Sequence, residues 1–171
     1  MTVDALYTKK VKCPVCNNEF TTSKMRTTQV RIDKVDGDFM NHYKSENPLK
    51  YQVFVCPKCG YSALENRFNK IRAAEREIIK KEVSSKWKER DYSGPRTDDD
   101  AIQCYMLAFY CGQLMGIKNY ELGNIALKIA WFFRAKKSDE EMRFLQNAVE
   151  LFEKAFYEED LLSQSTDEIT L

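Results

Sequence analysis

The sequence has few of the features that most enzymes and membrane proteins need. It contains one histidine and six glycines among 171 residues, and it has no nucleophile–base pair, phosphate-binding glycine loop or dinucleotide fingerprint. No apolar run approaches the about 18 residues of a membrane span. The first residues, MTVDALYTKKVK, lack the apolar stretch of a signal peptide. We therefore expect a cytoplasmic protein that is not an enzyme and does not contact a membrane.

The chain also lacks an overall excess of charge. It has 27 basic and 26 acidic side chains, which gives a net charge of +1. This balance conceals a net charge of +8 in residues 1–96 and of −7 in residues 97–171. A basic segment can bind an anionic partner, and an acidic segment a basic one. The simpler interpretation is that the two halves are solvated or attract each other.

Four of the six cysteines form two matched pairs, in CPVCN (13–17) and CPKCG (56–60). Two thiolates three residues apart can bind one tetrahedral metal ion, and two such pairs complete the four-sulfur shell that suits zinc. The residue after each pair, Asn17 or Gly60, tolerates the positive φ that such a turn needs. The sequence therefore predicts a structural Zn²⁺ site, closed to substrate, with the ligands Cys13, Cys16, Cys56 and Cys59.

The spacing between the pairs is wide, because 39 residues separate Cys16 from Cys56. We expect a hairpin and an extended loop at 33–48 in this interval, followed by a strand at 51–55 with alternating faces. His42 lies in that loop and is expected at the surface. The alternative is that each cysteine pair is separate and either buried or redox-active, which would make this a thiol–disulfide protein.

A helical pattern begins near Ser62. Its apolar stripe is expected to comprise Ile71, Ala74, Ile78 and Trp87. The turn residues DYSGPRT (91–97) then predict a boundary, with Thr97 capping the next helix and three aspartates in its first turn. The predicted organisation is a zinc-ribbon-like module at 1–65, a connecting helix and turn at 66–96, and a helical domain at 97–171.

The second half contains an internal repeat. Residues 101–110 (AIQCYMLAFY) align without gaps with residues 148–157 (AVELFEKAFY), at an offset of 47 residues. Both copies space a small, an aromatic and a small residue along one helical face, which is typical of tetratricopeptide-like repeats. A helix at 120–135 is expected between them. Because a standard repeat has about 34 residues, the loops at 114–119 or 135–140 should be longer than usual.

These patterns predict an α+β fold that is mostly α: a small zinc-ribbon-like β module followed by a tetratricopeptide-like antiparallel helical domain. Cys104 and Cys111 are expected to be small core residues rather than ligands or a redox pair. The last residues, TDEITL (166–171), have the pattern of a helix start. We therefore expect that a further helix pair is missing and that the chain is truncated there.

The sequence resembles the bacterial family called domain of unknown function 2225. The resemblance is carried by CPVC (13–16), DGDF (36–39), NPLKYQVFVCPKCGYSA (47–63), SSKWKERDYSGPRT (84–97), DDDAIQCYMLAFYC (98–111) and LKIAWFFR (127–134). It implies a zinc-ribbon-like start and tetratricopeptide-like helices, and it brings no established activity or catalytic residues. Similar proteins usually continue into another helix pair, so the resemblance also implies a short copy.

The sequence favours a zinc-binding interaction or scaffold protein with a protein partner. The alternative is a nucleic-acid-binding zinc-ribbon protein, in which basic side chains act beside the stacking rings of Tyr43 and Tyr51. The candidate nucleic-acid or anion contacts are Lys24, Arg26, Arg31, Lys34 and Lys50. The identity of the partner and the oligomeric state are left open by the sequence.

Overall fold

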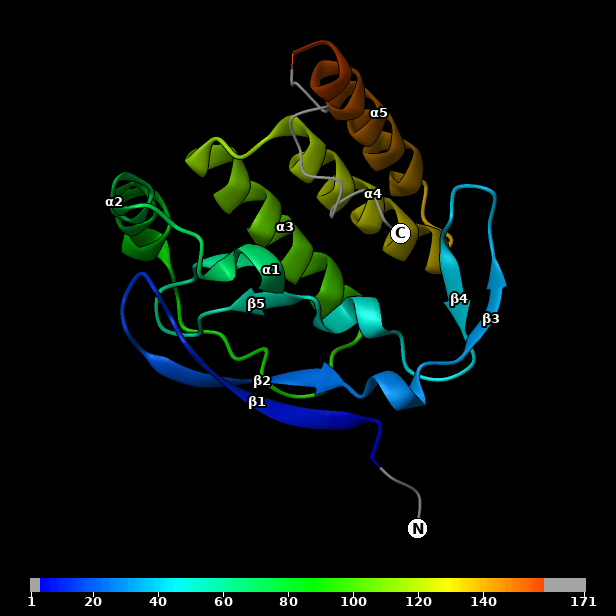
Figure 1. Cartoon of the computed structure of the whole chain (residues 1–171), viewed down its shortest axis with the longest axis horizontal. Helices are drawn as coiled ribbons and strands as arrows, with labels where there is room; N and C mark the ends of the chain where they lie inside the picture. The colour runs from blue at the N-terminus through cyan, green and yellow to red at the C-terminus, as the bar shows by residue number, and fades with distance from the viewer. Residues whose placement is uncertain (1–3, 159–171) are drawn as a thin grey trace. The chain divides into compact units, whose positions relative to one another are not determined.

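The computed structural model describes residues 4–158. Its fold is α+β and mostly α, as predicted, with small β-hairpins followed by antiparallel helices (Figure 1). The chain forms two compact units, Met1–Met115 and Gly116–Leu171. Residues 97–115 thus belong to the same compact unit as the strands, whereas the sequence pattern grouped them with the later helices. The three predicted domain ranges stay a prediction.

The described part of the first unit, from residue 4 onward, contains three antiparallel hairpins. The first pairs β1 (Leu6–Lys12) with β2 (Glu19–Met25), from Leu6↔Met25 to Lys12↔Glu19. The second pairs β3 (Ile32–Val35) with β4 (Asn41–Tyr43), and the third pairs β5 (Val53–Val55) with β6 (Ser62–Leu64). Short 3₁₀ helices, η1 (Thr27–Gln29) and η2 (Pro48–Tyr51), separate the hairpins. The two cysteine pairs occupy the turns of the first and third hairpins.

Two expectations about the segment between the cysteine pairs were wrong. The supposed loop at 33–48 contains the β3–β4 hairpin, whose turn is closed by a 2.9 Å hydrogen bond from Asp36 N to Met40 O. Tyr51 belongs to η2 rather than to a strand, and all three residues of β5 are buried. The strand has no solvent-exposed face because α1 and α3 also contact it. An alternation of apolar and polar residues therefore could not reveal which of its side chains are buried.

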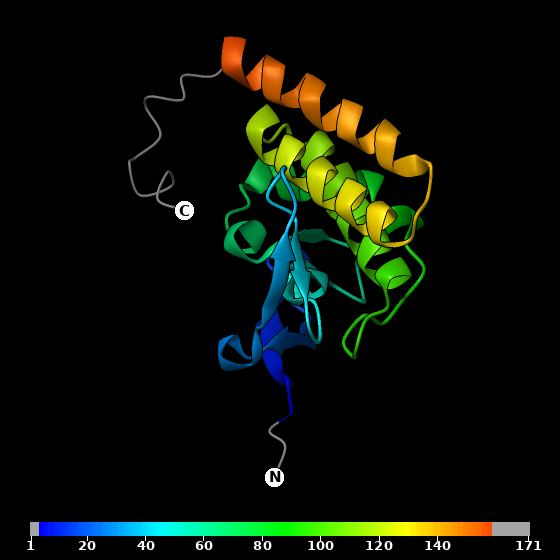
Figure 2. The ribbon, with the colours of Figure 1, turned by 90° about the vertical axis from the view of Figure 1, so that its right-hand side faces the viewer.

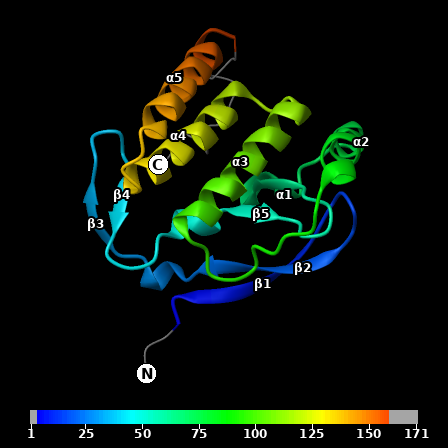
Figure 3. The same cartoon turned by 180° about the vertical axis from the view of Figure 1, so that it is seen from behind.

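The remaining elements of the first unit are helical: α1 (Glu65–Phe68), α2 (Ala73–Glu82), η3 (Ser84–Lys86) and α3 (Asp98–Met115). Figure 3 shows α2 beside α3. The predicted stripe on the first long helix was wrong. Ile78 is 38% exposed, whereas Ile79 is fully buried. Trp87 follows η3 instead of continuing α2, since the helix stops at Glu82.

Phe68 is the centre of the core of the first unit. Its ring lies 6.0 Å from the ring of Phe20, 5.6 Å from that of Phe54 and 4.9 Å from that of Tyr61, measured between centroids. The Tyr61 hydroxyl donates to the Phe68 carbonyl at 3.1 Å, so the buried polar atom is satisfied. These contacts pack the first and third hairpins against a single ring.

Arg96 ties the loop before α3 to the strands. Its side chain is almost wholly buried, and it donates to the carbonyls of Lys50 and Val53 at 2.8 Å and of Tyr92 at 3.1 Å. Sequence analysis assigned this arginine only to a turn. The cap of α3 was predicted correctly, because Asp100 N donates to Thr97 Oγ1 at 3.1 Å.

The two copies of the repeat have different surroundings. In α3 the Tyr105 hydroxyl donates to the Leu49 carbonyl at 2.7 Å, so the first copy contacts η2. In the second unit, α4 (Asn119–Ala135) and α5 (Glu140–Glu158) form an antiparallel hairpin (Figure 2). There Phe152 packs on Gly123, where an added Cβ would lie 2.9 Å from the ring. The tetratricopeptide likeness stays a prediction.

The longer loops expected around the middle helix were wrong. Only residues 116–118 join α3 to α4, and only residues 136–139 join α4 to α5. The extra length of the repeat lies in the helices, which have 18, 17 and 19 residues. Among residues 4–158, no helix is both long and apolar enough to cross a membrane. The expected helix start at 166–171 lies outside the described residues.

Candidate metal centre

The two cysteine turns have the same backbone pattern. In the first, Asn17 N donates to Cys13 O and Cys13 N donates to Asn18 O, both at 2.9 Å. In the second, Gly60 N donates to Cys56 O and Cys56 N donates to Tyr61 O, again at 2.9 Å. Asn17 has φ 61° and Gly60 has φ 78°, which confirms the positive φ predicted after each pair. Each hairpin therefore presents its two thiols from an equivalent turn.

These turns bring together the four predicted ligands, whose sulfur atoms all lie within 4.8 Å of one another. The Sγ atoms of Cys13 and Cys59 are 3.6 Å apart, as are those of Cys16 and Cys56. Cys16 is partly exposed and the other three are buried. All four are free thiols, since a disulfide would require sulfur atoms about 2.05 Å apart.

The distances between the sulfur atoms fit a tetrahedral metal ion. Metal–sulfur bonds of about 2.3 Å place the corners of a four-sulfur tetrahedron about 3.8 Å apart, close to the 3.6 Å between the sulfur atoms of each pair. Each close pair joins one cysteine of the first turn to one of the second. The cluster is therefore compatible with one ion that joins the two hairpins.

Electrostatics in the cluster also favour a cation. Hydrogen bonds from the Cys13 and Cys59 thiols lower the pKa of Cys56 to about 2. The contact with Cys56 raises the pKa of Cys13 to about 12, and the contacts with Cys13 and Cys56 raise that of Cys59. One thiolate is thus stabilised by its neighbours, whereas further ionisation places like charges together. A divalent cation removes that cost, because it offsets the added charges.

Trp87 packs against the second cysteine turn, a contact that sequence analysis missed. Its indole N–H donates to the Pro57 carbonyl at 2.8 Å. A Cβ added to Gly60 would lie 2.5 Å from the indole ring. The ring therefore covers the backbone between Cys56 and Gly60 and supports its conformation. The sequence of the turn predicted the need for a glycine-like residue at position 60. It could not predict the contact with Trp87, which lies 27 residues further along the chain.

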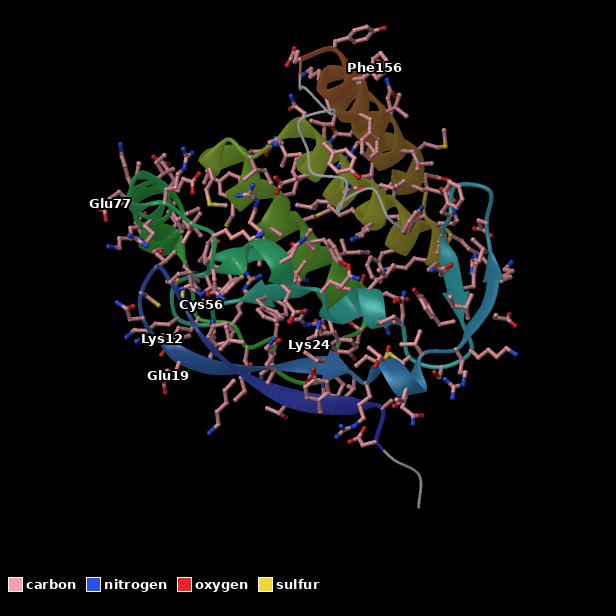
Figure 4. All side chains as sticks on the ribbon, in the orientation of Figure 1. Lys12, Glu19, Lys24, Cys56, Glu77 and Phe156 are labelled. Carbon is pink, nitrogen blue, oxygen red and sulfur yellow. The ribbon has the colours of Figure 1, made fainter. Side chains whose placement is uncertain are left out.

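The surroundings of the cluster are basic at its surface. Lys12 directly precedes the first pair, Lys58 lies inside the second, and both side chains are exposed. Figure 4 labels Lys12 and Glu19, which pair across the last position of the β1–β2 ladder, together with Cys56. The two cysteine turns therefore each carry one exposed lysine.

The five predicted basic contacts lie on several elements and have different partners. Lys24 on β2 pairs with Glu65, and Lys50 on η2 pairs with Glu46 at 2.9 Å. Arg26 Nε donates to the Asp4 carbonyl at 3.1 Å, and Arg31 donates to the Thr28 carbonyl at 2.8 Å. Lys34 on β3 is exposed. Two of the five positive charges are thus already balanced by carboxylates.

Of the two rings expected to stack on bases, Tyr51 is fully buried. Its hydroxyl accepts from Arg96 N at 3.1 Å, so that expectation was wrong for this residue. Tyr43 is half-buried on β4. The reason is tertiary: the chain before β5 turns inward as η2, which places the Tyr51 ring in the core.

His42 and the two remaining cysteines lie outside the metal cluster. His42 Nε2 is 2.9 Å from Asp36 Oδ2, and the imidazole is 30% exposed. Cys104 and Cys111 are fully buried in α3, and burial raises the pKa of each thiol to about 11. Both cysteines lie in the core, as expected, in their neutral form.

The geometry defines a class of protein: one with small β-hairpins that carry a four-cysteine cluster, followed by antiparallel helices. The chain belongs to the family described as "Uncharacterized protein conserved in bacteria (DUF2225)", whose model matches residues 6–171. This match confirms the resemblance noted in the sequence.

The chain is also similar to a protein of Borreliella burgdorferi that is described as "Uncharacterized protein". The two are 27% identical over 151 residues, which cover 77% of this chain and 54% of the relative. The chain therefore spans about half the length of that curated relative. No solved structure matches the chain.

Proposed function

We propose that this is a non-enzymatic interaction protein in which a structural Zn²⁺ ion stabilises the hairpins and the helices bind a protein partner. The single observation that carries the proposal is the convergence of four free thiols within 4.8 Å. A four-thiolate shell suits zinc better than magnesium or calcium, which prefer oxygen ligands. Such a shell also leaves no position open for a substrate, so it fits a structural role.

The redox alternative is less well supported by the cluster. A thiol–disulfide enzyme needs one accessible, acidified thiol beside a resolving cysteine. Here each cysteine has a sulfur of the opposite hairpin at 3.6 Å, and three of the four side chains are buried. Oxidation within either pair would also remove two ligands from the cluster. The arrangement therefore fits metal binding better than disulfide exchange.

Elemental analysis of the purified chain, paired with one ligand variant and one control variant, tests the zinc proposal. The parent is expected to contain one zinc ion per chain. Cys56→Ser should lose nearly all of it, because three thiolates and a hydroxyl bind zinc far more weakly. Cys104→Ala is the control, since this buried cysteine lies outside the cluster; it should keep zinc despite some loss of packing. A parent without zinc, or a Cys56→Ser variant that retains it, would contradict the proposal.

A further inference from the structure

Helix α5 has two sets of apolar side chains: one is buried, and the other is largely exposed apart from Phe152, which contacts Gly123 on α4. Phe144, Ala148, Leu151 and Ala155 are buried at spacings of four and three residues. A second set follows at spacings of three and four: Met142, Leu145, Val149, Phe152 and Phe156. We call this second set the α5 stripe. Of its members, Met142, Val149 and Phe156 are 69%, 54% and 71% exposed.

The spacing of the residues in the α5 stripe indicates which kind of secondary structure can pack on it. Alternating steps of three and four residues keep these side chains within about 80° of the helix circumference. The stripe runs for about 21 Å along the axis, from Met142 to Phe156, at about 1.5 Å per residue. Figure 4 labels Phe156 on the last turn of α5. A narrow a/d stripe of this length is the surface on which another helix packs with knobs into holes.

The charged side chains beside the α5 stripe indicate which charge the partner helix should carry. Glu153 and then Glu150 follow the stripe around the exposed side of α5, and both side chains are exposed. Arg143 and Lys154 lie further round, and Arg143 is already 3.1 Å from Glu140. Over Glu140–Glu158 the helix has five acidic and two basic side chains. A second copy of α5 would bring like charges together, whereas a basic helix would pair with them.

From these observations we propose that the α5 stripe is the docking site for an amphipathic helix of a partner protein, with leucine-like residues at heptad spacing and lysine or arginine beside them. This inference rests on the proposed function, because it names the kind of partner that the helices bind. Burial of Val149 and Phe156 supplies the apolar contact, and Glu150 and Glu153 select a basic partner over an acidic one.

The test is a fluorescence-anisotropy titration of the full 171-residue chain against three labelled peptides of about 21 residues. The first has leucine at the a and d positions and lysine at e and g. The second has glutamate in place of lysine. The third has the composition of the first with its leucines moved out of heptad register. The chain should bind the first at least about tenfold more tightly than either of the others.

Variants of the chain distinguish docking on the α5 stripe from nonspecific electrostatic attraction between the chain and the peptide. Val149→Ser combined with Phe156→Ser should weaken binding of the first peptide at least about tenfold. Lys154→Ser, on the far side of the helix, should leave it unchanged. Glu150→Lys combined with Glu153→Lys should shift the preference toward the glutamate peptide, a gain that misfolding does not produce.

Three results would overturn the inference: equal affinity for the three peptides, a stripe variant that binds like the parent, or a parent dimer that the Val149 and Phe156 substitutions dissociate. The last result would make a second copy the occupant. If the chain contains zinc and binds no heptad peptide, this inference fails alone. If the chain contains no zinc, the proposed function fails whatever the peptides do.

Discussion

Gly60 allows the second cysteine turn to form in close contact with an aromatic ring. Its φ of 78° lies in a region that costs other residues about 1 kcal/mol. An added Cβ would also meet the Trp87 indole at 2.5 Å. Both constraints act on the residue directly after Cys59, so they affect the placement of that thiol.

We predict that Gly60→Ala lowers the free energy of unfolding by about 2–4 kcal/mol, since backbone strain adds to steric overlap. Chemical denaturation of the purified protein measures the change. Gly94→Ala is the matched control, because nothing lies within 4 Å of its added Cβ. Adding Trp87→Ala to Gly60→Ala should cost less than the sum of the single changes, since the overlap is removed. Simple additivity would show that the ring does not constrain the glycine.

At the scale of elements, Glu65 links the β1–β2 hairpin to the start of α1. Its carboxylate is 2.7 Å from Lys9 Nζ on β1 and also pairs with Lys24 on β2. Partial burial opposes ionisation of Glu65, but the hydrogen bonds from the two lysines outweigh it and lower the pKa. A group whose folded-state pKa is lowered stabilises the fold above its unfolded pKa. This stabilisation disappears as the pH falls through the lowered value.

Glu65→Gln should therefore reduce stability by about 0.5–1 kcal/mol at pH 7, a modest effect because solvent screens the pairs. The difference from the parent should shrink toward zero below about pH 4. Denaturant titrations of both proteins at each pH measure it, so that acid effects common to both cancel. Glu89→Gln, at an exposed position, is the control. A difference that stays constant with pH would contradict the charge-based explanation.

Arg96 holds three segments of the chain together through hydrogen bonds from one guanidinium group. It donates to carbonyls before α3, in η2 and in β5, and it is only 4% exposed. Arg96→Leu should destabilise the protein by at least about 3 kcal/mol, because three carbonyls, two of them in buried hydrogen bonds, lose a charged donor. Arg96→Lys should rescue only part of this, since an ammonium lacks the planar fork. Thermal unfolding of the parent and the variants measures these changes. Arg90→Leu, at an exposed position, is the control and should change stability little.

At the scale of the molecule, the two compact units should respond differently to loss of metal. Zinc contributes on the order of 10–16 kcal/mol to the folding of small zinc modules. The cluster joins hairpins of the first unit, whereas α4 and α5 pack against each other in the second. Chelation should therefore increase hydrogen exchange most strongly in residues 6–64 and least in the helices α4 and α5. Mass spectrometry of the peptides measures this, and added zinc should reverse it. Equal loss of protection in both regions would contradict the prediction.

Local chemistry in the sequence was sufficient for several features. Each cysteine pair specified its own turn and the positive φ after it, because these features depend on residues within one turn. The matched spacing of the two pairs also predicted their convergence, because a four-sulfur shell needs both. The Thr97 cap and the helix that begins at Asn119 were likewise local, since hydrogen bonds between neighbours and a 3.6-residue period determine them. The helical small–aromatic–small faces were also recognisable in the sequence.

Tertiary packing decided the rest. The burial of both faces of β5, the place of Trp87 over Gly60 and the inward turn of Tyr51 depend on segments distant in the chain, which no local period encodes. The same holds for the two copies of the repeat: similar sequences contact η2 in one unit and α4 in the other. A helical face specifies that something packs on it, whereas only the folded chain specifies what does, because burial free energy depends on area and not on the identity of the neighbour.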